Sequence, residues 1–548
     1  MKKKLKILLA QLNPIGGDVK GNYKKLEDAW KRACESKIDI IALPEMFLSG
    51  YPIDDLVLRD DFISSIEKHI SKLAKLTLNG PAIIVGCPRN DNGIIRNSVF
   101  ILDNGEILGF RDKAKLPNEH EFYDNRQFVP GDLPGPILIR GIRFGVPICE
   151  DIWDPEVCEC LKESGAEIIL SINGSTYNID KMEKRVNNVV SRAVENDIPL
   201  IYLNLVGGQD ELIFDGGSFA VNSDGQLACQ LPMFETFDGV IEIENNSSSL
   251  KISSKHIFKD QTGYESLYSA IMLSLRDYVT KNSFKNVVLG LSGGIDSALV
   301  SAVAVDALGP ENVRCFMLPS KFTSQDSTND AKDIARRLDI KLEALSIEEL
   351  YNSVENTLKK TFNSLEKDIT EENIQSRLRA LLLMAVSNKF GNMLISTSNK
   401  SESAVGYSTL YGDMSGGFAP LKDVWKTDVV GLCNWRNKNK PQSSKYPKLD
   451  IIPSNIIVKP PTAELRENQK DSDSLPDYKI LDEILALNIE EMKSEEEIIQ
   501  KGFEREVVRK VLKLLRISEY KRFQAPPGPK LGKKAFGRDR MYPLTNKF

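Results

Sequence analysis

Short apolar runs that alternate with polar, helix-like stretches recur along the chain and predict a mixed α/β protein. In the first half, such runs predict strands at 5–12, 39–43, 81–86, 98–102, 142–148, 168–172 and 200–205. The stretches 22–36 and 181–196 have apolar residues at helical spacing and predict helices. Strands that alternate with helices and hairpins indicate a layered α/β domain.

The second half repeats a strand–helix unit several times. Strands are predicted at 287–289, 313–318, 342–347 and 393–396, and helices at 264–280, 298–305, 328–338 and 374–389. Repeated units of this kind predict a doubly wound parallel sheet, which binds ligands at the carboxyl ends of its strands. The polar, proline-containing stretch 438–471 is predicted to form loops, and 481–514 is predicted to be helical.

The chain length and one serine-rich stretch predict two domains. A chain of 548 residues exceeds the usual size of one domain. Asn245–Ser249 and the following Ser253-Ser254 are polar and come after the last strand-like run of the first half. We therefore predict a first domain over 1–245, a linker over 246–262 and a second domain over 263–548.

Composition excludes several classes of protein. Hydrophobic residues make up 41% of the chain and charged residues 27%, with a net charge of −5, which favours a soluble globular protein without a nucleic-acid footprint. No apolar run approaches the length of a membrane span, and no signal sequence is evident, so a cytoplasmic protein is expected. The eight cysteines include no Cys-x-x-Cys pair, which argues against a zinc site or a disulfide framework.

The stretch Gly290–Ser297 has the sequence GLSGGIDS and lies between a predicted strand and a predicted helix. A glycine turn at a helix N-terminus presents main-chain N–H groups and the positive end of the helix dipole to an anion. A carboxylate beside bound phosphates, here Asp296, requires a cation between them and predicts Mg²⁺. The stretch lacks the Gly-Lys-Ser/Thr end of a Walker A loop. The plainer alternative is a glycine-rich turn without a ligand.

Three reactive side chains in the first half stand near the ends of predicted strands: Glu45, Lys113 and Cys149. A thiol needs a base beside it to attack an amide, and with only three histidines in the chain a glutamate is the simpler base. A lysine would stabilise the developing oxyanion. Taken singly, the three would be a strand-end charge, a surface lysine and an inert buried thiol.

In their order and flanking residues, these three resemble the Glu–Lys–Cys triad of the nitrilase superfamily, which implies an α-β-β-α sandwich. The family lysine stands three residues before Leu116-Pro117, which selects Lys113 over Lys115. The first half is more similar still to the glutaminase domain of glutamine-dependent NAD synthetases. That resemblance implies glutamine-binding roles for Ser175, Lys181 and Glu119. Departures from the family pattern occur at Glu119, where an aromatic residue is common, and at Asp124, where Glu is common.

The second half resembles the NAD synthetase domain of the ATP-pyrophosphatase family, which has a Rossmann-like sheet. The resemblance rests on Gly290–Ser297, on Thr397–Glu402, on Gly406–Asp413 and on Asp423–Thr427. It implies ATP contacts from Gly290, Leu291, Ser292, Gly293, Gly294, Ile295, Asp296, Ser297, Lys321 and Thr397. It implies deamido-NAD contacts from Glu402 and Lys521 and from a segment that includes Asn373, Gln375, Arg377 and Arg379. It also implies Mg²⁺ ligands at Asp296 and Glu402.

Together the two resemblances imply a ligase that hydrolyses glutamine at Cys149 and uses the ammonia to amidate deamido-NAD. ATP would adenylate the substrate carboxylate and yield AMP and pyrophosphate. A homo-oligomer acting on small molecules, with no nucleic-acid or membrane partner, is expected. Three alternatives remain open: another adenylating amidotransferase acting on a nucleotide base or a tRNA, an uncoupled amidase fused to a nucleotide sensor, and a structural assembly subunit.

Overall fold

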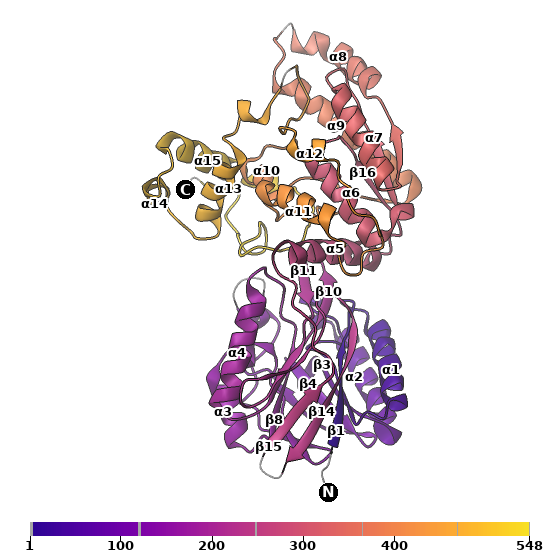
Figure 1. Cartoon of the computed structure of the whole chain (residues 1–548), viewed down its shortest axis with the longest axis vertical. Coiled ribbons are helices and arrows are strands. Elements are labelled where there is room, and N and C mark those ends of the chain that lie inside the picture. The colour runs from indigo at the N-terminus through magenta and orange to yellow at the C-terminus, as the bar shows by residue number, and fades with distance from the viewer. Residues whose placement is uncertain (1–3, 119–121, 247–248, 364, 468, 547–548) are drawn as a thin grey trace. The chain divides into compact units, whose positions relative to one another are not determined.

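The computed structural model describes residues 4–118, 122–246, 249–363, 365–467 and 469–546. The chain divides into two compact units, Met1–Gln261 and Thr262–Phe548 (Figure 1). Each unit has its own β-sheets with helices packed against them.

Two large sheets form the centre of the first unit (Figure 1). The first has the strand order β15-β14-β1-β2-β3-β4-β5 and contains β1 (Lys4–Gln11), β2 (Ile40–Ala42), β3 (Ala82–Asp91), β4 (Ile94–Asp103), β5 (Glu106–Asp112), β14 (Phe237–Asn246) and β15 (Ser249–Ser254). The second has the order β13-β12-β9-β8-β7-β6 and contains β6 (Ile137–Ile139), β7 (Ile142–Gly145), β8 (Ile168–Asn173), β9 (Leu200–Asn204), β12 (Phe219–Val221) and β13 (Leu227–Gln230). A separate hairpin pairs β10 (Val206–Gln209) with β11 (Leu212–Asp215).

Alternation along β1 explains how the first sheet is covered on both faces. Ile7 and Leu9 belong to the core between the two sheets, whereas Leu8 and Ala10 belong to the core beneath the helices. Those helices are α1 (Val19–Glu35) and α2 (Asp60–Leu76), whose apolar residues recur at helical spacing. Burial on both faces is the reason that this strand reads as a continuous apolar run.

The outer face of the second sheet is covered by α3 (Pro155–Glu163) and α4 (Lys181–Glu195). Val157 of α3 and Val189 of α4 share a buried core with Ile169 and Leu200 of the sheet. The first unit is therefore a sandwich of four layers, helices–sheet–sheet–helices, and the predicted α-β-β-α fold is confirmed.

The serine-rich stretch after residue 245 is not a separate linker throughout. Strand β15 pairs antiparallel with β14, with Ile243 opposite Ile252. Leu250 and Ile252 are buried in the core between the sheets. The predicted linker over 246–262 is therefore wrong for Ser249–Ser254, because alternating apolar residues give that segment a face to bury.

A parallel sheet of order β18-β17-β16-β19 organises the second unit. Its strands are β16 (Val287–Gly290), β17 (Val313–Met317), β18 (Lys341–Ala344) and β19 (Met393–Leu394). The helices α5 (Gly263–Lys281), α6 (Ile295–Leu308), α7 (Gln325–Arg337), α8 (Glu348–Phe362) and α9 (Ile369–Phe390) accompany it. The chain leaves β16 on one side for β17 and later returns on the other side as β19, so the strand order reverses at β16. The predicted doubly wound parallel sheet is confirmed.

From Lys400 onward, the described part of the C-terminal region contains helices and no β-strand. These are α10 (Lys400–Val405), α11 (Lys426–Lys438), α12 (Ser454–Val458), α13 (Tyr478–Ile489), α14 (Glu495–Gln500), α15 (Arg505–Ile517) and α16 (Glu519–Phe523). The stretch predicted as helical over 481–514 is three helices, because Ser494 caps a new helix and Gly502, at φ +103°, ends it. Among the described residues, no helix is both long and apolar enough to span a bilayer.

A buried ion pair joins four segments of the second unit. Arg436 of α11 makes a bidentate contact with Asp306 of α6 at 2.7 and 3.0 Å, and both side chains are fully buried. Asp306 also accepts hydrogen bonds from Tyr268 of α5 and from Ser444 in the loop after α11, each at 2.6 Å. One carboxylate therefore fixes the predicted loop region 438–471 to the helices beneath it.

We predict that Asp306→Ala destabilises this region by about 3–5 kcal/mol, because it leaves the Arg436 charge buried without a partner. Hydrogen exchange measured by mass spectrometry should show faster exchange in α5, α6 and α11 and no change in the first unit. Lys448→Ala, which removes an exposed ion pair to Asp339, is the control and should change little. Equal protection in the Asp306 variant and the wild type would contradict the assigned role.

Candidate functional site

Strand ends of the first unit bring Glu45, Lys113 and Cys149 into one buried region. Glu45 follows β2, Lys113 follows β5, and Cys149 lies a few residues after β7. The Lys113 Nζ atom is 2.8 Å from Glu45 Oε1, and both side chains are almost completely buried. Glu45 and Lys113 are 68 positions apart in sequence, so their contact depends on the sheet.

The Glu45 carboxylate is held on both oxygens. Asn97 Nδ2 donates to Oε1 at 2.8 Å, in addition to Lys113, and the main-chain N–H of Gly174 donates to Oε2 at 2.7 Å. Lys113 also donates to Asp124 at 3.0 Å, and Tyr51 donates to the other oxygen of Asp124 at 3.1 Å. The ammonium group is thus shared by two buried carboxylates.

Cys149 begins the 3-10 turn Cys149–Ile152 with φ at +48°, a left-handed conformation that is uncommon for a residue with a Cβ. Asp151 stabilises this turn by accepting the Ile148 N–H at 2.9 Å. The same carboxylate accepts the N–H groups of Ala114 and Lys115 at 2.9 and 2.8 Å. One buried aspartate therefore ties the cysteine turn to the loop that carries Lys113.

Electrostatics at this site favour a protonated thiol beside a charged lysine. Burial raises the pKa of Cys149 well above its usual value, and Glu45 raises it further, whereas Lys113 and the Gly174 N–H oppose the shift. Burial lowers the pKa of Lys113, but Glu45 and Asp124 more than offset that effect, so its pKa lies well above its usual value. The thiol therefore needs a base to take its proton before it attacks an electrophile, and the Glu45 carboxylate is close enough to raise the pKa of that thiol.

The residues expected to hold glutamine lie partly around this site. Ser175 follows β8 and is buried, directly after the Gly174 N–H that donates to Glu45. Lys181 begins α4 and donates to Thr176 Oγ1 at 3.1 Å. Glu119 lies outside the described residues.

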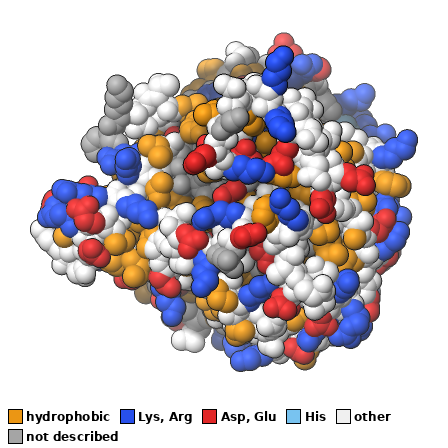
Figure 2. All heavy atoms as spheres, turned by 90° about the horizontal axis from the view of Figure 1, so that it is seen from above, with side chains coloured by type: hydrophobic (Ala, Val, Ile, Leu, Met, Phe, Trp, Pro, Cys, Tyr) orange, Lys and Arg blue, Asp and Glu red, His pale blue; other side chains and the backbone are white. Residues whose placement is uncertain are grey.

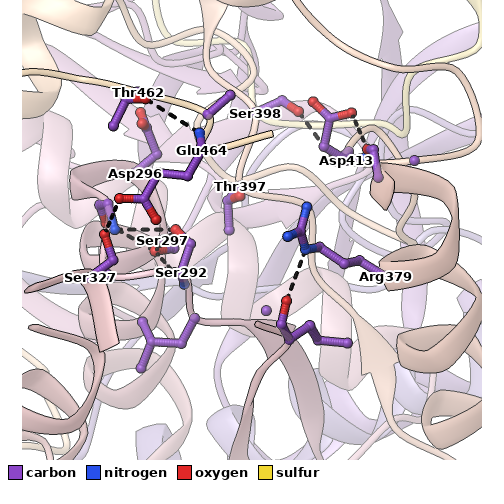
Figure 3. Close-up of a pocket in the computed structure, with 18 of the residues that line it drawn as sticks. Ser292, Asp296, Ser297, Ser327, Arg379, Thr397, Ser398, Asp413, Thr462 and Glu464 are labelled. Carbon is purple, nitrogen blue, oxygen red and sulfur yellow. Dashed lines mark hydrogen bonds between the residues drawn. The ribbon is translucent and has the colours of Figure 1, made fainter. Parts of the chain in front are cut away.

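A cavity of about 340 Å³ lies at the carboxyl end of the second unit's sheet (Figure 3). It is lined by the whole of the loop 290–297, by the ends of β17 and β19 and by Thr397. Ser292 and Ser297 hydrogen bond to each other at 3.1 Å, and Gly293 has φ at +83°. A Cβ on Gly293 would lie 2.3 Å from the Ser327 carbonyl oxygen, so only glycine fits this turn.

Asp296 and Glu402 are joined by a lysine. The Lys426 Nζ atom is 2.5 Å from Asp296 Oδ2 and 3.0 Å from Glu402 Oε1, and Asn399 donates to Asp296 Oδ1 at 2.9 Å. Burial and the nearby Asp296 raise the pKa of Glu402 in spite of Lys426. Two carboxylates and one ammonium leave a net negative charge on this wall of the cavity.

That charge and the donor set fit a divalent cation. Each carboxylate oxygen has two lone pairs and uses at most one of them in the hydrogen bonds from Asn399 and Lys426. Within the described ranges, no group of three or more His, Cys, Asp and Glu side chains is arranged to hold a metal by itself. Mg²⁺ is typically bound by one or two carboxylates together with substrate phosphates and water, which matches this wall.

The cavity lining includes one residue of the predicted dinucleotide-binding segment and one loop for which no role was predicted. Arg379 of α9 lines the cavity and donates Nε to the Leu318 carbonyl at 3.0 Å, and burial lowers its pKa to about 10, so it stays charged. The loop 459–465 also lines the cavity, and its Glu464 accepts hydrogen bonds from the hydroxyls of Ser324 and Ser327, each at 2.7 Å. Figure 3 shows Glu464 and Ser327 in the cavity wall. The only sequence signal for this loop was its polar, proline-containing composition.

Other predicted ligand residues lie beside the cavity lining. Lys321 is exposed and is not among the lining residues, so its contact with ATP stays a prediction. Asn373, Arg377 and Lys521 do not line the cavity either, but each contacts the segment 406–410. Thr409 in that segment does line the cavity, so these three residues form an adjoining surface.

Comparisons with known proteins match both units. Residues 6–246 match the carbon-nitrogen hydrolase family model, and residues 267–525 match the NAD synthase family model. The glutamine-dependent NAD(+) synthetase of Rhodobacter capsulatus is 45% identical and covers 100% of this chain and 99% of its own. That of Thermotoga maritima is 42% identical, with coverage of 100% and 99%.

A solved structure extends the likeness to three dimensions. The glutamine-dependent NAD+ synthetase from Acinetobacter baumannii, in complex with ADP, is 38% identical with a TM-score of 0.80. The alignment covers 99% of both chains. Similarity over the whole length of these proteins means that neither unit was matched in isolation.

We predict that Lys113→Met destabilises the first unit by about 3–5 kcal/mol, because two buried carboxylates lose their shared cation. Hydrogen exchange in peptides containing residue 45 and residue 124 should accelerate. The matched control is Lys115→Met, which removes two half-exposed ion pairs to Asp154 and Glu156 and should leave exchange unchanged. If the two variants behave alike, Lys113 is not the cation on which the site depends.

Proposed function

The chain belongs to the family of glutamine-dependent NAD(+) synthetases, and we propose that it makes NAD from deamido-NAD with ammonia released from glutamine. It is a carbon–nitrogen ligase that consumes ATP. One observation supports this proposal above all: the chain contains both the buried Glu45–Lys113–Cys149 group and the cavity lined by the glycine-rich loop 290–297. It is also similar to such enzymes over its full length. A structural subunit would need neither site.

Glutamine hydrolysis starts from the protonated Cys149 thiol. Glu45 takes the thiol proton as sulfur attacks the amide carbon, and the carbonyl oxygen becomes an oxyanion. Of the three N–H donors of Lys113, two are used by Glu45 and Asp124, and the third serves the oxyanion. One such donor contributes about 3 kcal/mol to transition-state stabilisation. Collapse to the thioester returns the proton to the leaving nitrogen, and ammonia departs. Water, deprotonated by the same Glu45, then attacks the thioester, and glutamate leaves as the thiol regains its proton.

Ser175 and Lys181 are the proposed contacts of the glutamine substrate. Ser175 is buried beside Gly174, whose N–H already faces the site, and Lys181 offers a positive charge for the glutamine α-carboxylate. Glu119 remains a proposed contact from the resemblance alone.

In the second unit, the loop 290–297 is proposed to hold the ATP phosphates. Its main-chain N–H groups and the N-terminus of α6 complement phosphate charge, and Ser292 and Ser297 add hydroxyl donors. Thr397, Arg379 and Lys426 line the same cavity, whereas Lys321 is proposed to reach ATP from its exposed position. When bound by Asp296 and Glu402, Mg²⁺ would offset charge on the leaving pyrophosphate.

Amidation needs an activated carboxylate. Ammonia does not displace oxide from a free carboxylate, so the nicotinate carboxylate of deamido-NAD attacks the α-phosphorus of ATP and pyrophosphate leaves. Ammonia then attacks the acyl-adenylate carbon, and AMP leaves with the bonding electrons. Asn373, Arg377 and Lys521, which surround the segment 406–410 beside the cavity, are the proposed contacts of the dinucleotide, with Glu402 at the cavity wall.

Small molecules are the proposed partners. The net charge of −5, together with acidic and basic side chains interspersed over the face drawn in Figure 2, supports the absence of a nucleic-acid surface. Full-length similarity to NAD synthetases favours this substrate over those of other adenylating amidotransferases. A homo-oligomer in the cytoplasm remains part of the proposal.

We predict that Cys149→Ala lowers NAD formation from glutamine by at least about 1000-fold, because no other group replaces the nucleophile. NAD formation from added ammonium should stay within a factor of about two of the wild type, since that route bypasses the thiol. Both are measured by a coupled dehydrogenase assay of NAD. Cys160→Ala, a half-buried thiol on α3, is the control. Equal loss with both nitrogen donors would contradict the division of labour between the two units.

We predict that Asp296→Asn lowers NAD formation by about 100-fold or more with either nitrogen donor, because both routes share the adenylation step and a neutral amide weakens the cation site. The loss should be accompanied by weaker Mg²⁺ dependence in an ATP titration. Asp326→Asn, an exposed residue of α7, controls for charge. Undiminished synthesis from ammonium would refute the assignment of Asp296.

A further inference from the structure

The short loop Gly174–Thr176 forms one wall of the cysteine site but has no regular structure of its own. It begins immediately after β8 ends at Asn173. Its Gly174 N–H is 2.7 Å from Glu45 Oε2, and a Cβ on Gly174 would lie 3.1 Å from the same oxygen. The position of this loop therefore sets one of the hydrogen bonds to the proposed base.

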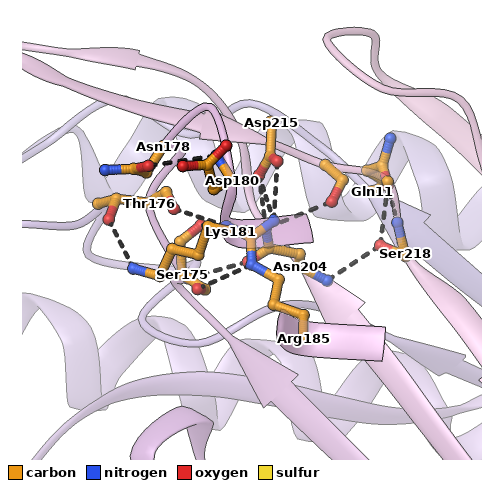
Figure 4. Close-up of polar contacts among 12 residues, drawn as sticks. Gln11, Ser175, Thr176, Asn178, Asp180, Lys181, Arg185, Asn204, Asp215 and Ser218 are labelled. Atoms are coloured by element: carbon orange, nitrogen blue, oxygen red, sulfur yellow. Dashed lines mark hydrogen bonds and ion pairs between the residues drawn. The ribbon is translucent and has the colours of Figure 1, made fainter. Parts of the chain in front are cut away.

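Arg185 of α4 makes three hydrogen bonds to this loop and two to Asp215. Its Nε donates to Ser175 Oγ at 3.1 Å, and Nη2 donates to the carbonyls of Ser175 and Thr176 at 3.0 and 2.6 Å. Its Nη1 makes two contacts with the carboxylate of Asp215, at 2.8 and 2.7 Å. The five N–H donors of the guanidinium thus match these five hydrogen bonds (Figure 4).

Asp215 supplies the counter-charge from the end of β11. The ion pair is fully buried, at 0% and 1% side-chain exposure. Asn204, at the end of β9, joins the pair by donating to Asp215 Oδ1 at 3.2 Å and to the Ser175 carbonyl at 3.1 Å, and it accepts the Ser175 N–H at 2.9 Å. The loop is therefore bonded on its N–H, carbonyl and hydroxyl groups.

Such an arrangement is costly if fold stability is its only purpose. A buried ion pair often stabilises a fold no more than apolar residues of the same volume would, because desolvation opposes the attraction. What a planar guanidinium provides that an apolar side chain does not is directional bonding of several groups at once. Here the bonded groups belong to the loop that faces Glu45.

We propose that Arg185 and Asp215 are positioning residues for glutamine hydrolysis, which hold the Gly174–Thr176 loop so that Gly174 meets Glu45 and Ser175 meets the substrate. The side-chain hydrogen bonds of Glu45 and Lys113 go to Asn97, Asp124, Gly174 and each other, so Arg185 and Asp215 act through the loop. This inference rests on the proposed glutaminase function of the first unit.

Arg185→Lys tests the proposal, because a lysine keeps the charge for Asp215 but cannot bridge Asp215, Ser175 Oγ and two carbonyls from one nitrogen. We expect kcat with glutamine to fall by about 10- to 100-fold, the loss typical of a catalytic group displaced by about 1 Å. NAD formation from ammonium should stay within a factor of about two, since the second unit is unchanged. Thermal unfolding of each variant is recorded alongside.

Arg192→Lys is the matched control, because Arg192 lies on the same helix and pairs with Glu195 rather than with the loop. It should leave both routes unchanged. Asp215→Asn is the second variant. We expect the same selective fall in kcat with glutamine, but a smaller one, and this variant tests the positioning role if Arg185→Lys does not fold. A proportional fall in both routes would reveal a purely structural pair and overturn the proposal. So would a folded Arg185→Lys enzyme with wild-type kcat for glutamine.

The result is separable from the proposed function itself. If Cys149→Ala abolishes the glutamine route while Arg185→Lys leaves it intact, only the positioning role fails. If Cys149→Ala retains the glutamine route, the glutaminase assignment fails, and the positioning role that rests on it fails as well.

Discussion

A buried lysine shared by two carboxylates recurs in both candidate sites. In the first unit, Lys113 lies between Glu45 and Asp124, and in the second, Lys426 lies between Asp296 and Glu402. One lysine against two carboxylates leaves a net negative charge in a buried region with little water. Under the proposed function, this residual charge would favour proton uptake by Glu45 in the first unit and a metal cation in the second. The folds differ, but the electrostatic constraint is the same.

The same device also serves structure alone. Lys400 is fully buried between Asp423 and Glu490, at 2.8 and 2.9 Å, and it also donates to the Lys534 carbonyl. It belongs to the stretch Thr397–Glu402, whose other members Thr397 and Glu402 line the cavity. Because neighbouring residues at the start of α10 point in different directions, one short motif lines the cavity on one side and anchors the C-terminal tail on the other.

How far the candidate sites were predictable depends on the range of the contacts involved. The loop 290–297 is a local feature, a strand, a glycine turn and a helix N-terminus, and its sequence predicted the shape found. Glu45, Lys113 and Cys149 were selected through their flanking residues, and the structure brings Glu45 and Lys113 within hydrogen-bond distance. No role was predicted for Lys426 or Arg185, because each is an ordinary charged residue on a helix until the partner from a distant segment is known. Arg379 was matched through the family segment, and its position in the cavity lining came from the structure. The linker prediction failed at Ser249–Ser254 because polar residues alternate there with buried ones, and polarity alone dominated the interpretation.

The sequence by itself determined the two fold classes, the family and the turn in the glycine-rich loop 290–297, since periodicity, glycine placement and local motifs are properties of adjacent residues. Only the tertiary structure decided which charges are buried together. Whether Lys113 or Lys115 is desolvated, whether Arg185 meets Asp215, and whether Glu464 reaches Ser324 and Ser327 are set by strands and helices that fold from far apart in the chain. The energy of a charge depends on its distance to other charges and to water, and neither distance is written in the local sequence.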